Sequence, residues 1–125
     1  MLAQEASEHA GRRDYAGALS KLEAAIAIRG DVPEYSMMRC MLSERVSNQP
    51  RLSCYAEVVR AYQINGAPCE SNLNCVVAAS MASLPEALRY RTRYLASPKS
   101  PEDQAIAEGM LGDFSRNVVL HSILP

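Results

Sequence analysis

The amino-acid sequence predicts an all-α domain made of antiparallel helical hairpins, and three observations lead to this fold class. Turn-forming residues divide the 125 residues into short segments. Within the segments apolar residues recur at helical spacing, as Leu22 and Ile26 do, and no long stretch alternates apolar and polar residues as a strand does. Residue types that cap helix N-termini recur at intervals of 34 and 35 residues, at Asp14, Asn48 and Ser83. Intervals of this length are typical of a repeated two-helix unit, so we expect about seven helices.

The whole chain, residues 1–125, is expected to form one domain with three hairpins, because each capping residue lies at the turn between two helical segments. A small side chain stands at the same place in the first helix of each pair, at Ala6, Cys40 and Cys75. Two helix backbones can approach each other closely at such positions. The expected hairpins cover residues 2–30, 32–64 and 70–97.

The turns of the second and third hairpins carry similar signals. Asn48 and Ser83 are each followed two residues later by a proline, Pro50 and Pro85. Proline fits the first turn of a helix, because the backbone N–H that it lacks has no partner there. Ser83 and Glu86 also form the pattern of a capping box. We therefore expect Asn48 and Ser83 to begin the second helix of their hairpins.

A further helix is predicted over residues 101–118. Ser100 is the expected N-cap and Pro101 stands in the first turn, followed by acidic residues that suit the positive end of the helix dipole. The tail at 119–125 is unusually apolar. We expect the tail either to pack back onto the domain or to dock on a partner.

Composition and motifs exclude several classes of function. The formal net charge is -1 with both signs mixed along the chain, so the basic surface of a nucleic-acid-binding protein is not expected. The longest apolar runs are far shorter than the roughly 18 residues of a membrane span, and no secretory signal is visible. Phosphate-binding, hydrolase and metalloprotease motifs do not occur, and His9 and His121 stand at opposite ends of the sequence. We expect no enzyme, no cofactor and no nucleic-acid partner.

The cysteines Cys40, Cys54, Cys69 and Cys75 lack the C-x-x-C spacing of zinc and thioredoxin-like sites, so no metal site is expected. Two interpretations stay open. In an antiparallel second hairpin Cys40 and Cys54 stand level across the two helices, and Cys69 can fold back onto Cys75 near a helix start capped by Ser71. These two disulfides, which we favour, place the protein in the periplasm or outside the cell. Reduced, buried cysteines in a cytoplasmic protein are the alternative.

The segment 12–28, in which Tyr15 precedes a small residue at Ala18, resembles the second half of a tetratricopeptide repeat. The match is good over about one repeat and diffuse over roughly the first hundred residues: Gly30 replaces the usual proline, and no Trp occurs in any first helix. The resemblance implies that the hairpins stack into a right-handed superhelix, with the helix at 101–118 as its cap. It does not identify a partner.

The resemblance also implies a binding surface, because the first helices of such hairpins line a concave face that holds an extended peptide or a partner helix. The three methionines at 37, 38 and 41 suit an adaptable apolar surface. A core position is the commoner outcome for any one of them, but Met37 and Met38 point about 100 degrees apart around a helix. The implied partner-binding residues are Gln4, Ser7, Met37, Met38, Met41, Glu44, Arg45, Asn72, Leu73, Val76 and Ser80.

A run of three arginines, Arg89, Arg91 and Arg93, stands among the tyrosines Tyr90 and Tyr94. Such a run either binds an acidic group or forms a solvated helix face on which arginine stems cover the tyrosine rings. We favour the solvated face.

These expectations lead to a protein-interaction module, of adaptor or chaperone type, in a bacterial envelope or secretion assembly. The alternative is an immunity protein that neutralises a bacterial toxin or effector. An adaptor uses the concave groove of the helices, whereas an inhibitor can use any face and often uses an acidic one. The oligomeric state does not follow from the sequence.

Overall fold

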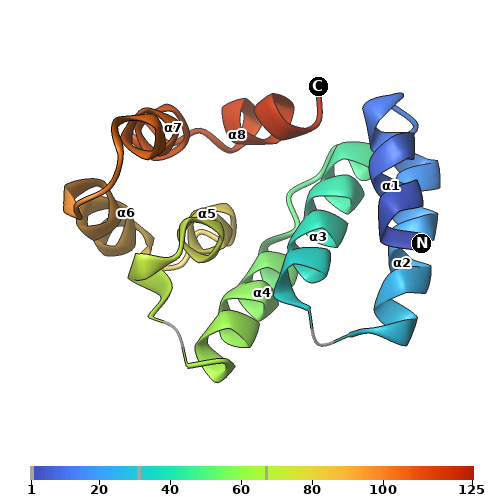
Figure 1. Cartoon of the computed structure of the whole chain (residues 1–125), viewed down its shortest axis with the longest axis horizontal. Helices are drawn as coiled ribbons and strands as arrows, with labels where there is room; N and C mark the ends of the chain where they lie inside the picture. The colour runs from blue at the N-terminus through green and yellow to red at the C-terminus, as the bar shows by residue number, and fades with distance from the viewer. Residues whose placement is uncertain (1, 31, 67) are drawn as a thin grey trace. The chain divides into compact units, whose positions relative to one another are not determined.

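A computed structural model of the chain describes residues 2–30, 32–66 and 68–125, and within these ranges it contains eight α-helices, one short 3-10 helix and no strand (Figure 1). The predicted all-α class is confirmed. The chain divides into two compact units, which we call unit 1 (Met1–Arg51 with Leu120–Pro125) and unit 2 (Leu52–Val119). Among the described residues, no helix has both the length and the apolar character needed to cross a membrane.

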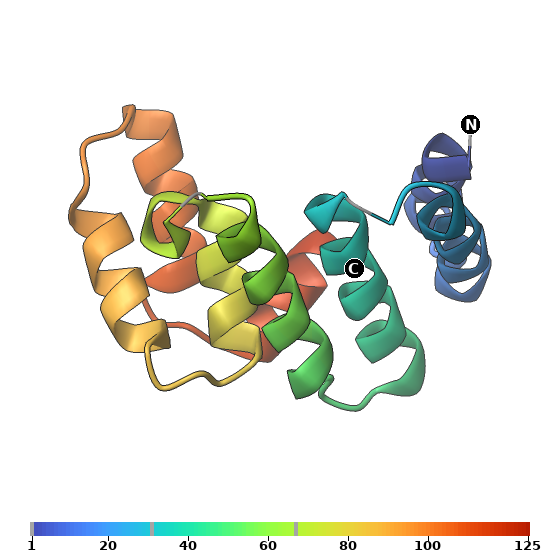
Figure 2. The ribbon, with the colours of Figure 1, turned by 90° about the horizontal axis from the view of Figure 1, so that it is seen from below.

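Unit 1 contains α1 (Leu2–Gly11), α2 (Tyr15–Ile28) and α3 (Pro33–Ser47). These helices pack in chain order, α1 against α2 and α2 against α3, and the first two lie side by side in both ribbon views (Figures 1 and 2). Ala6 on α1 and Ala18 on α2 are both buried, as expected where two helix backbones approach closely.

The turn between α1 and α2 ends one helix and begins the next. Arg13 has a left-handed backbone, with φ 60, and the N–H of Asp14 donates to the carbonyl of His9 at 2.8 Å. This hydrogen bond satisfies one of the last carbonyls of α1. The carboxylate of Asp14 then accepts a hydrogen bond from the N–H of Gly17 at 3.1 Å. The predicted cap at Asp14 is confirmed.

Unit 2 contains α4 (Leu52–Ile64), the 3-10 helix η1 (Cys69–Ser71), α5 (Leu73–Met81), α6 (Ala87–Ala96), α7 (Pro101–Leu111) and the beginning of α8 (Arg116–Ile123). Its central element is α5, which packs against α4, η1, α6 and α7. Figure 2 shows α5 (yellow) between α4 (green) and α6 (orange). Every residue from 75 to 81 is buried, which is typical of a helix enclosed on all sides.

A disulfide between Cys69 and Cys75 joins η1 to the first turn of α5, with the two α-carbons 5.2 Å apart. The residue that caps α5 is Asn72, whose side chain accepts a hydrogen bond from the N–H of Cys75 at 3.1 Å. The expected cap, Ser71, belongs to η1 instead. Cys40 and Cys54 are disulfide-bonded as well, so none of the four cysteines is a free thiol.

Two of the three predicted N-caps are wrong, because Asn48 and Ser83 lie where helices end. Asn48, with φ 57, follows α3 and donates its N–H to the carbonyl of Glu44 at 2.7 Å. Ser83, with φ 55, follows α5, and the next N–H, that of Leu84, donates to the carbonyl of Ala79 at 3.1 Å. Left-handed residues of this kind commonly close a helix C-terminus.

The helices that follow these turns start later than predicted. The first residues of α4 and α6 are Leu52 and Ala87, so Pro50 and Pro85 lie in the connections before them. Glu86 flanks α6 without a side-chain cap, and the predicted capping box does not form. The predicted second hairpin is divided, since α3 belongs to unit 1 and α4 to unit 2. The right-handed superhelical stack stays a prediction.

The helix predicted over 101–118 is two helices, α7 and α8. Ser100 accepts a hydrogen bond from the N–H of Asp103 at 3.1 Å, which confirms the predicted cap. Gly112 follows the last residue of α7, and the hydroxyl of Ser115 accepts a hydrogen bond from the N–H of Val118 at 3.4 Å at the start of α8. The apolar tail is therefore partly helical. Its residues Leu120 and Leu124 are buried, so the tail packs on the protein as expected.

Candidate functional site

The predicted partner-binding residues of unit 1 separate into exposed and buried groups. Gln4 and Ser7 are exposed on α1, whereas Met37, Met41 and Glu44 are buried. Met37 and Met41 lie one helical turn apart and share the inward face of α3, so these methionines are core residues and not part of a binding surface. Met38 and Arg45 are half-buried.

In unit 2 the predicted partner-binding residues have structural roles. Asn72 caps α5, Leu73 is half-buried, and Val76 and Ser80 are buried. The hydroxyl of Ser80 donates to the carbonyl of Val76 at 3.0 Å and accepts from the guanidinium of Arg91 at 3.0 Å. Because α5 is enclosed, these residues do not line a groove.

The arginines of α6 are held by neighbouring groups of unit 2. Arg91 also lies over the ring of Phe114, at 5.2 Å from its centre, and Arg89 lies over Tyr90 at 5.4 Å. Arg93 donates two hydrogen bonds to the carboxylate of Glu70, at 3.0 and 3.1 Å, and so ties α6 to η1. The interpretation of this run as a helix face with arginines over aromatic rings agrees with these contacts.

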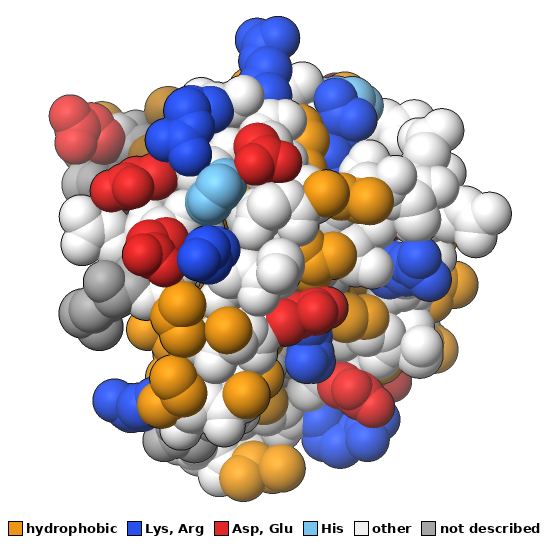
Figure 3. Space-filling model, turned by 90° about the vertical axis from the view of Figure 1, so that its right-hand side faces the viewer, with side chains coloured by type: hydrophobic (Ala, Val, Ile, Leu, Met, Phe, Trp, Pro, Cys, Tyr) orange, Lys and Arg blue, Asp and Glu red, His pale blue; other side chains and the backbone are white. Residues whose placement is uncertain are grey.

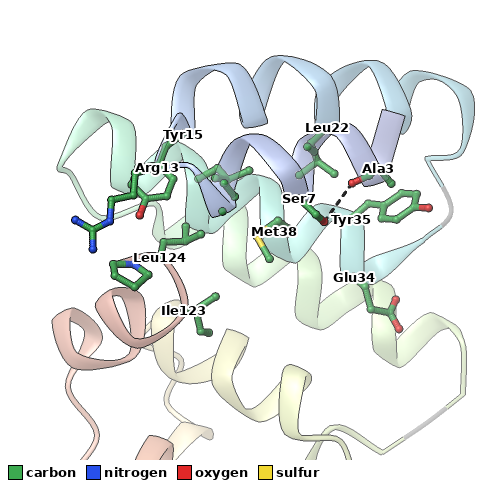
Figure 4. A pocket seen from close by; sticks show the side chains of 15 residues that line it. Ala3, Ser7, Arg13, Tyr15, Leu22, Glu34, Tyr35, Met38, Ile123 and Leu124 are labelled. Carbon is green, nitrogen blue, oxygen red and sulfur yellow. Dashed lines mark hydrogen bonds between the residues drawn. The ribbon is translucent and has the colours of Figure 1, made fainter. Parts of the chain in front are cut away.

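A cavity of about 550 Å³ lies in unit 1, bordered by α1, α2, α3 and the segment 120–125 (Figure 4). Small side chains of α1, Ala3, Ser7 and Ala10, form one wall. In Figure 4 Met38 of α3 lies in the middle of the cavity beside Ser7, whose hydroxyl donates to the carbonyl of Ala3 at 3.3 Å. Leu124 borders the cavity on the side where the chain ends in the view.

Opposite charges stand at the two ends of this cavity. Arg13 lies at the end near Tyr15 and Leu124, and Glu34 lies at the other end with Tyr35 (Figure 4). A ligand with a polar group at one end therefore places that group beside Arg13 in one orientation and beside Glu34 in the other.

Tyr15 is a residue of the cavity that the sequence analysis does not include among the partner-binding residues. Its side chain lines the cavity and is only 9% exposed, and its hydroxyl has no hydrogen-bond partner within the described part of the chain. The guanidinium of Arg45 lies over its ring, 5.1 Å from the centre. Arg45 in turn donates hydrogen bonds to the main-chain oxygens of Leu124 and Pro125, both at 3.2 Å.

The apolar surface of unit 1 continues beyond the cavity. A second hollow of about 280 Å³ shares Ala3 and Tyr35 with the first and extends to Ile28, which is 75% exposed at the end of α2. Figure 3, which faces α1 and α2, shows hydrophobic side chains gathered on one part of the surface and charged side chains around a histidine on another. Other charged side chains lie beside the hydrophobic ones in the same view.

The charged groups at the α1–α2 turn serve the helix cap. The backbone N–H of Gly17, and then the hydrogen bond with His9 at 2.8 Å, lower the pKa of the Asp14 carboxyl. Within the described ranges no three His, Cys, Asp or Glu side chains group as a metal site. Comparison with protein-family models, with curated proteins and with solved structures finds no match to this chain.

Proposed function

We propose that the chain is a protein-interaction module that holds an apolar peptide or helix in the cavity of unit 1. The observation that carries this proposal is the open cavity of about 550 Å³, bordered by Tyr15, whose buried hydroxyl has no hydrogen-bond partner among the described residues. Binding sites commonly have volumes of roughly 300–1,000 Å³ and combine apolar walls with a few polar groups. A buried hydroxyl without a partner is costly, and a ligand that supplies an acceptor or donor removes that cost.

The wall chemistry favours a peptide. The small side chains at Ala3, Ser7 and Ala10 let a second backbone approach α1 closely. The thioether of Met38 adapts to differently shaped apolar side chains. The charges of Arg13 and Glu34 at opposite ends give a bound segment a preferred direction.

The place of action that we propose is an oxidising compartment, the periplasm or the outside of the cell. All four cysteines are disulfide-bonded, and such bonds persist mainly in exported proteins. Thiol titration of the unfolded, unreduced protein purified from its own cells measures this directly. Four free thiols would contradict the proposed location.

The binding proposal is tested by photo-crosslinking in the source cells. A photo-crosslinking amino acid replaces Ser7, which is exposed beside the cavity, and in a control it replaces Ser20, which is exposed on α2 outside it. Each form is also made with Ala10→Trp, which fills the cavity, or with Ala24→Trp on the exposed face of α2. We expect one protein partner to crosslink at Ser7 and to be lost with Ala10→Trp alone.

The other outcomes are equally informative. Crosslinks that persist in the filled cavity would contradict a ligand inside it and favour the inhibitor of a toxin, which binds through another face. Crosslinks to small molecules alone would contradict a protein partner. Circular dichroism of both tryptophan variants checks that each remains helical.

A further inference from the structure

The cavity of unit 1 is already bordered by a piece of the same chain. We call the segment Leu120–Pro125 the strap; it belongs to unit 1 and follows α3 by more than seventy residues in sequence. Leu120 and Leu124 are buried, and the N–H of Leu124 donates to the carbonyl of Leu120 at 2.8 Å, which places them one helical turn apart. His121, Ser122 and Pro125 are exposed, so the strap is held by one face.

Arg45 recognises the strap through its main chain. A helix C-terminus leaves up to four carbonyls without partners inside the helix, and a cation placed there is favourable. Arg45 supplies donors to the main-chain oxygens of Leu124 and Pro125, just beyond the end of α8. Its guanidinium is positioned by the Tyr15 ring. Recognition of main-chain oxygens does not depend on the side chains of the strap, so other helix ends meet the same requirement.

The strap uses this site incompletely. The hydroxyl of Tyr15 stays without a partner among the described residues, although the Tyr15 side chain points toward Leu124 in Figure 4. The cavity of about 550 Å³ also stays open beside the strap. The hydroxyl is buried while the strap is in place, so a helix end that replaced the strap and reached one main-chain oxygen further would pair the hydroxyl and fill apolar space at the same time.

We propose that the strap is a resident occupant of the site, and that the partner is the last turn of a helix that displaces it. This inference rests on the proposed function and names its ligand class. The ligand is a helix end that carries two leucine-like side chains four residues apart, followed by main-chain oxygens that accept hydrogen bonds from Arg45 and Tyr15. A partner binds only the molecules in which the strap has left the site. Its apparent affinity is therefore its intrinsic affinity multiplied by the fraction of molecules with an open site. A variant with a loosened strap therefore binds a helix end more tightly than the natural chain does.

The experiment uses the full chain and a fluorescein-labelled synthetic peptide that repeats residues 116–125. Binding is measured by fluorescence anisotropy to the natural chain and to Leu124→Ala, which loosens the strap. Leu88→Ala, on the exposed face of α6 in unit 2, is the matched control. We expect Leu124→Ala to bind the peptide on the order of tenfold more tightly than the natural chain, and Leu88→Ala to match the natural chain.

A second variant separates competition from simple loosening. Arg45→Ala also releases the strap, but it removes the donors that the peptide needs, so we expect no gain in affinity. Leu124→Val, which keeps most of the apolar side chain, is expected to fall between the natural chain and Leu124→Ala. It keeps the test decisive if Leu124→Ala unfolds, which circular dichroism reports.

Several results would overturn the inference. Equal binding by the natural chain and both Leu124 variants would show that the strap does not compete, and no binding by any of them would show that its chemistry is not that of the ligand. A concentration-dependent dimer of the natural chain, lost in Leu124→Ala, would make a second copy the occupant. If a partner still crosslinks at Ser7 in any of these cases, only the strap inference fails; if that crosslink also fails, the proposed function fails with it.

Discussion

Unit 1 and unit 2 are both helical and each has a hollow, but the hollows differ in their lining: that of unit 2, of about 480 Å³, is lined in part by the charged side chains of Arg60, Glu86 and Arg89. In unit 2, α5 is enclosed, and buried Ser80 is hydrogen-bonded to both Val76 and Arg91. In unit 1 a cavity stays open and the buried hydroxyl of Tyr15 has no partner among the described residues. Filled interiors with paired polar groups stabilise a fold, whereas unfilled and unpaired sites commonly mark function. The comparison supports the proposal that the ligand site lies in unit 1.

The largest expected effect comes from deleting a buried side chain in the filled unit. Met81→Ala in α5 should lower the free energy of unfolding by about 2–5 kcal/mol, because the surrounding side chains cannot close the space. Met38→Ala, on the wall of the open cavity, should cost about 1 kcal/mol or less, since the Met38 side chain is partly exposed and borders open space. Urea unfolding measures both. Equal losses would remove the contrast between the units.

Removing the disulfide of unit 2 is the next largest change. Cys69→Ala together with Cys75→Ala frees η1 from α5, and the short closed loop corresponds to about 2 kcal/mol in the chain-entropy model. Urea unfolding measures the loss, and anisotropy with the peptide of residues 116–125 in the Leu124→Ala background measures the effect on unit 1. Stability should fall while peptide affinity stays the same. A matching fall in affinity would show that unit 2 contributes directly to binding.

A pair of hydroxyl deletions sharpens the comparison at single atoms. Ser80→Ala leaves Arg91 without the acceptor it now has at 3.0 Å, and should cost about 1–2 kcal/mol. Tyr15→Phe removes a buried hydroxyl that has no partner in the described residues, so stability should rise, by about 1 kcal/mol. Thermal unfolding compares the two variants. A large loss of stability in Tyr15→Phe would indicate that the hydroxyl makes a hydrogen bond in the folded protein.

The smallest expected effect is a pH dependence of unit 1. The pKa of Asp14 lies below its usual value of 3.8, chiefly because its carboxylate accepts the N–H of Gly17. The carboxyl therefore contributes stability that is fully present above pH 3.8 and is lost as the pH falls through its lower folded pKa. Asp14→Asn keeps a capping side chain without this titration. The melting temperature of Asp14→Asn should fall less steeply in acid than that of the natural chain; parallel curves would assign the titration to other carboxyls.

The sequence predicts that the chain is helical, but it does not predict the roles of the residues that separate the helices. Asp14 and Ser100 were recognised as caps, because a short polar side chain before an apolar run has one common use. Asn48 and Ser83 were misjudged, since the same residue types also accept the left-handed backbone that ends a helix. Only the hydrogen bonds of the neighbouring N–H groups distinguish the two uses.

The cavity was out of reach of sequence reasoning for a different reason. Periodicity places three methionines on one helix but does not say which face of the helix turns inward. In the structure Met37 and Met41 are core residues, whereas Met38 borders the cavity. Arg45 was selected as a groove residue, yet its partners are main-chain oxygens nearly eighty positions away. Every residue has a main-chain oxygen, so a contact between a side chain and a distant main chain produces no recognisable sequence pattern. The apolar tail was the one signal, and it pointed to packing without naming the site.

Among the described residues, the three residues other than glycine that have a left-handed backbone, Arg13, Asn48 and Ser83, lie at equal intervals along the chain. Glycine or asparagine adopts this backbone conformation most easily, so Arg13 and Ser83 hold a conformation that is strained for their residue types. Groove and core residues can be exchanged for others of similar size, but the chain must still reverse at these three places.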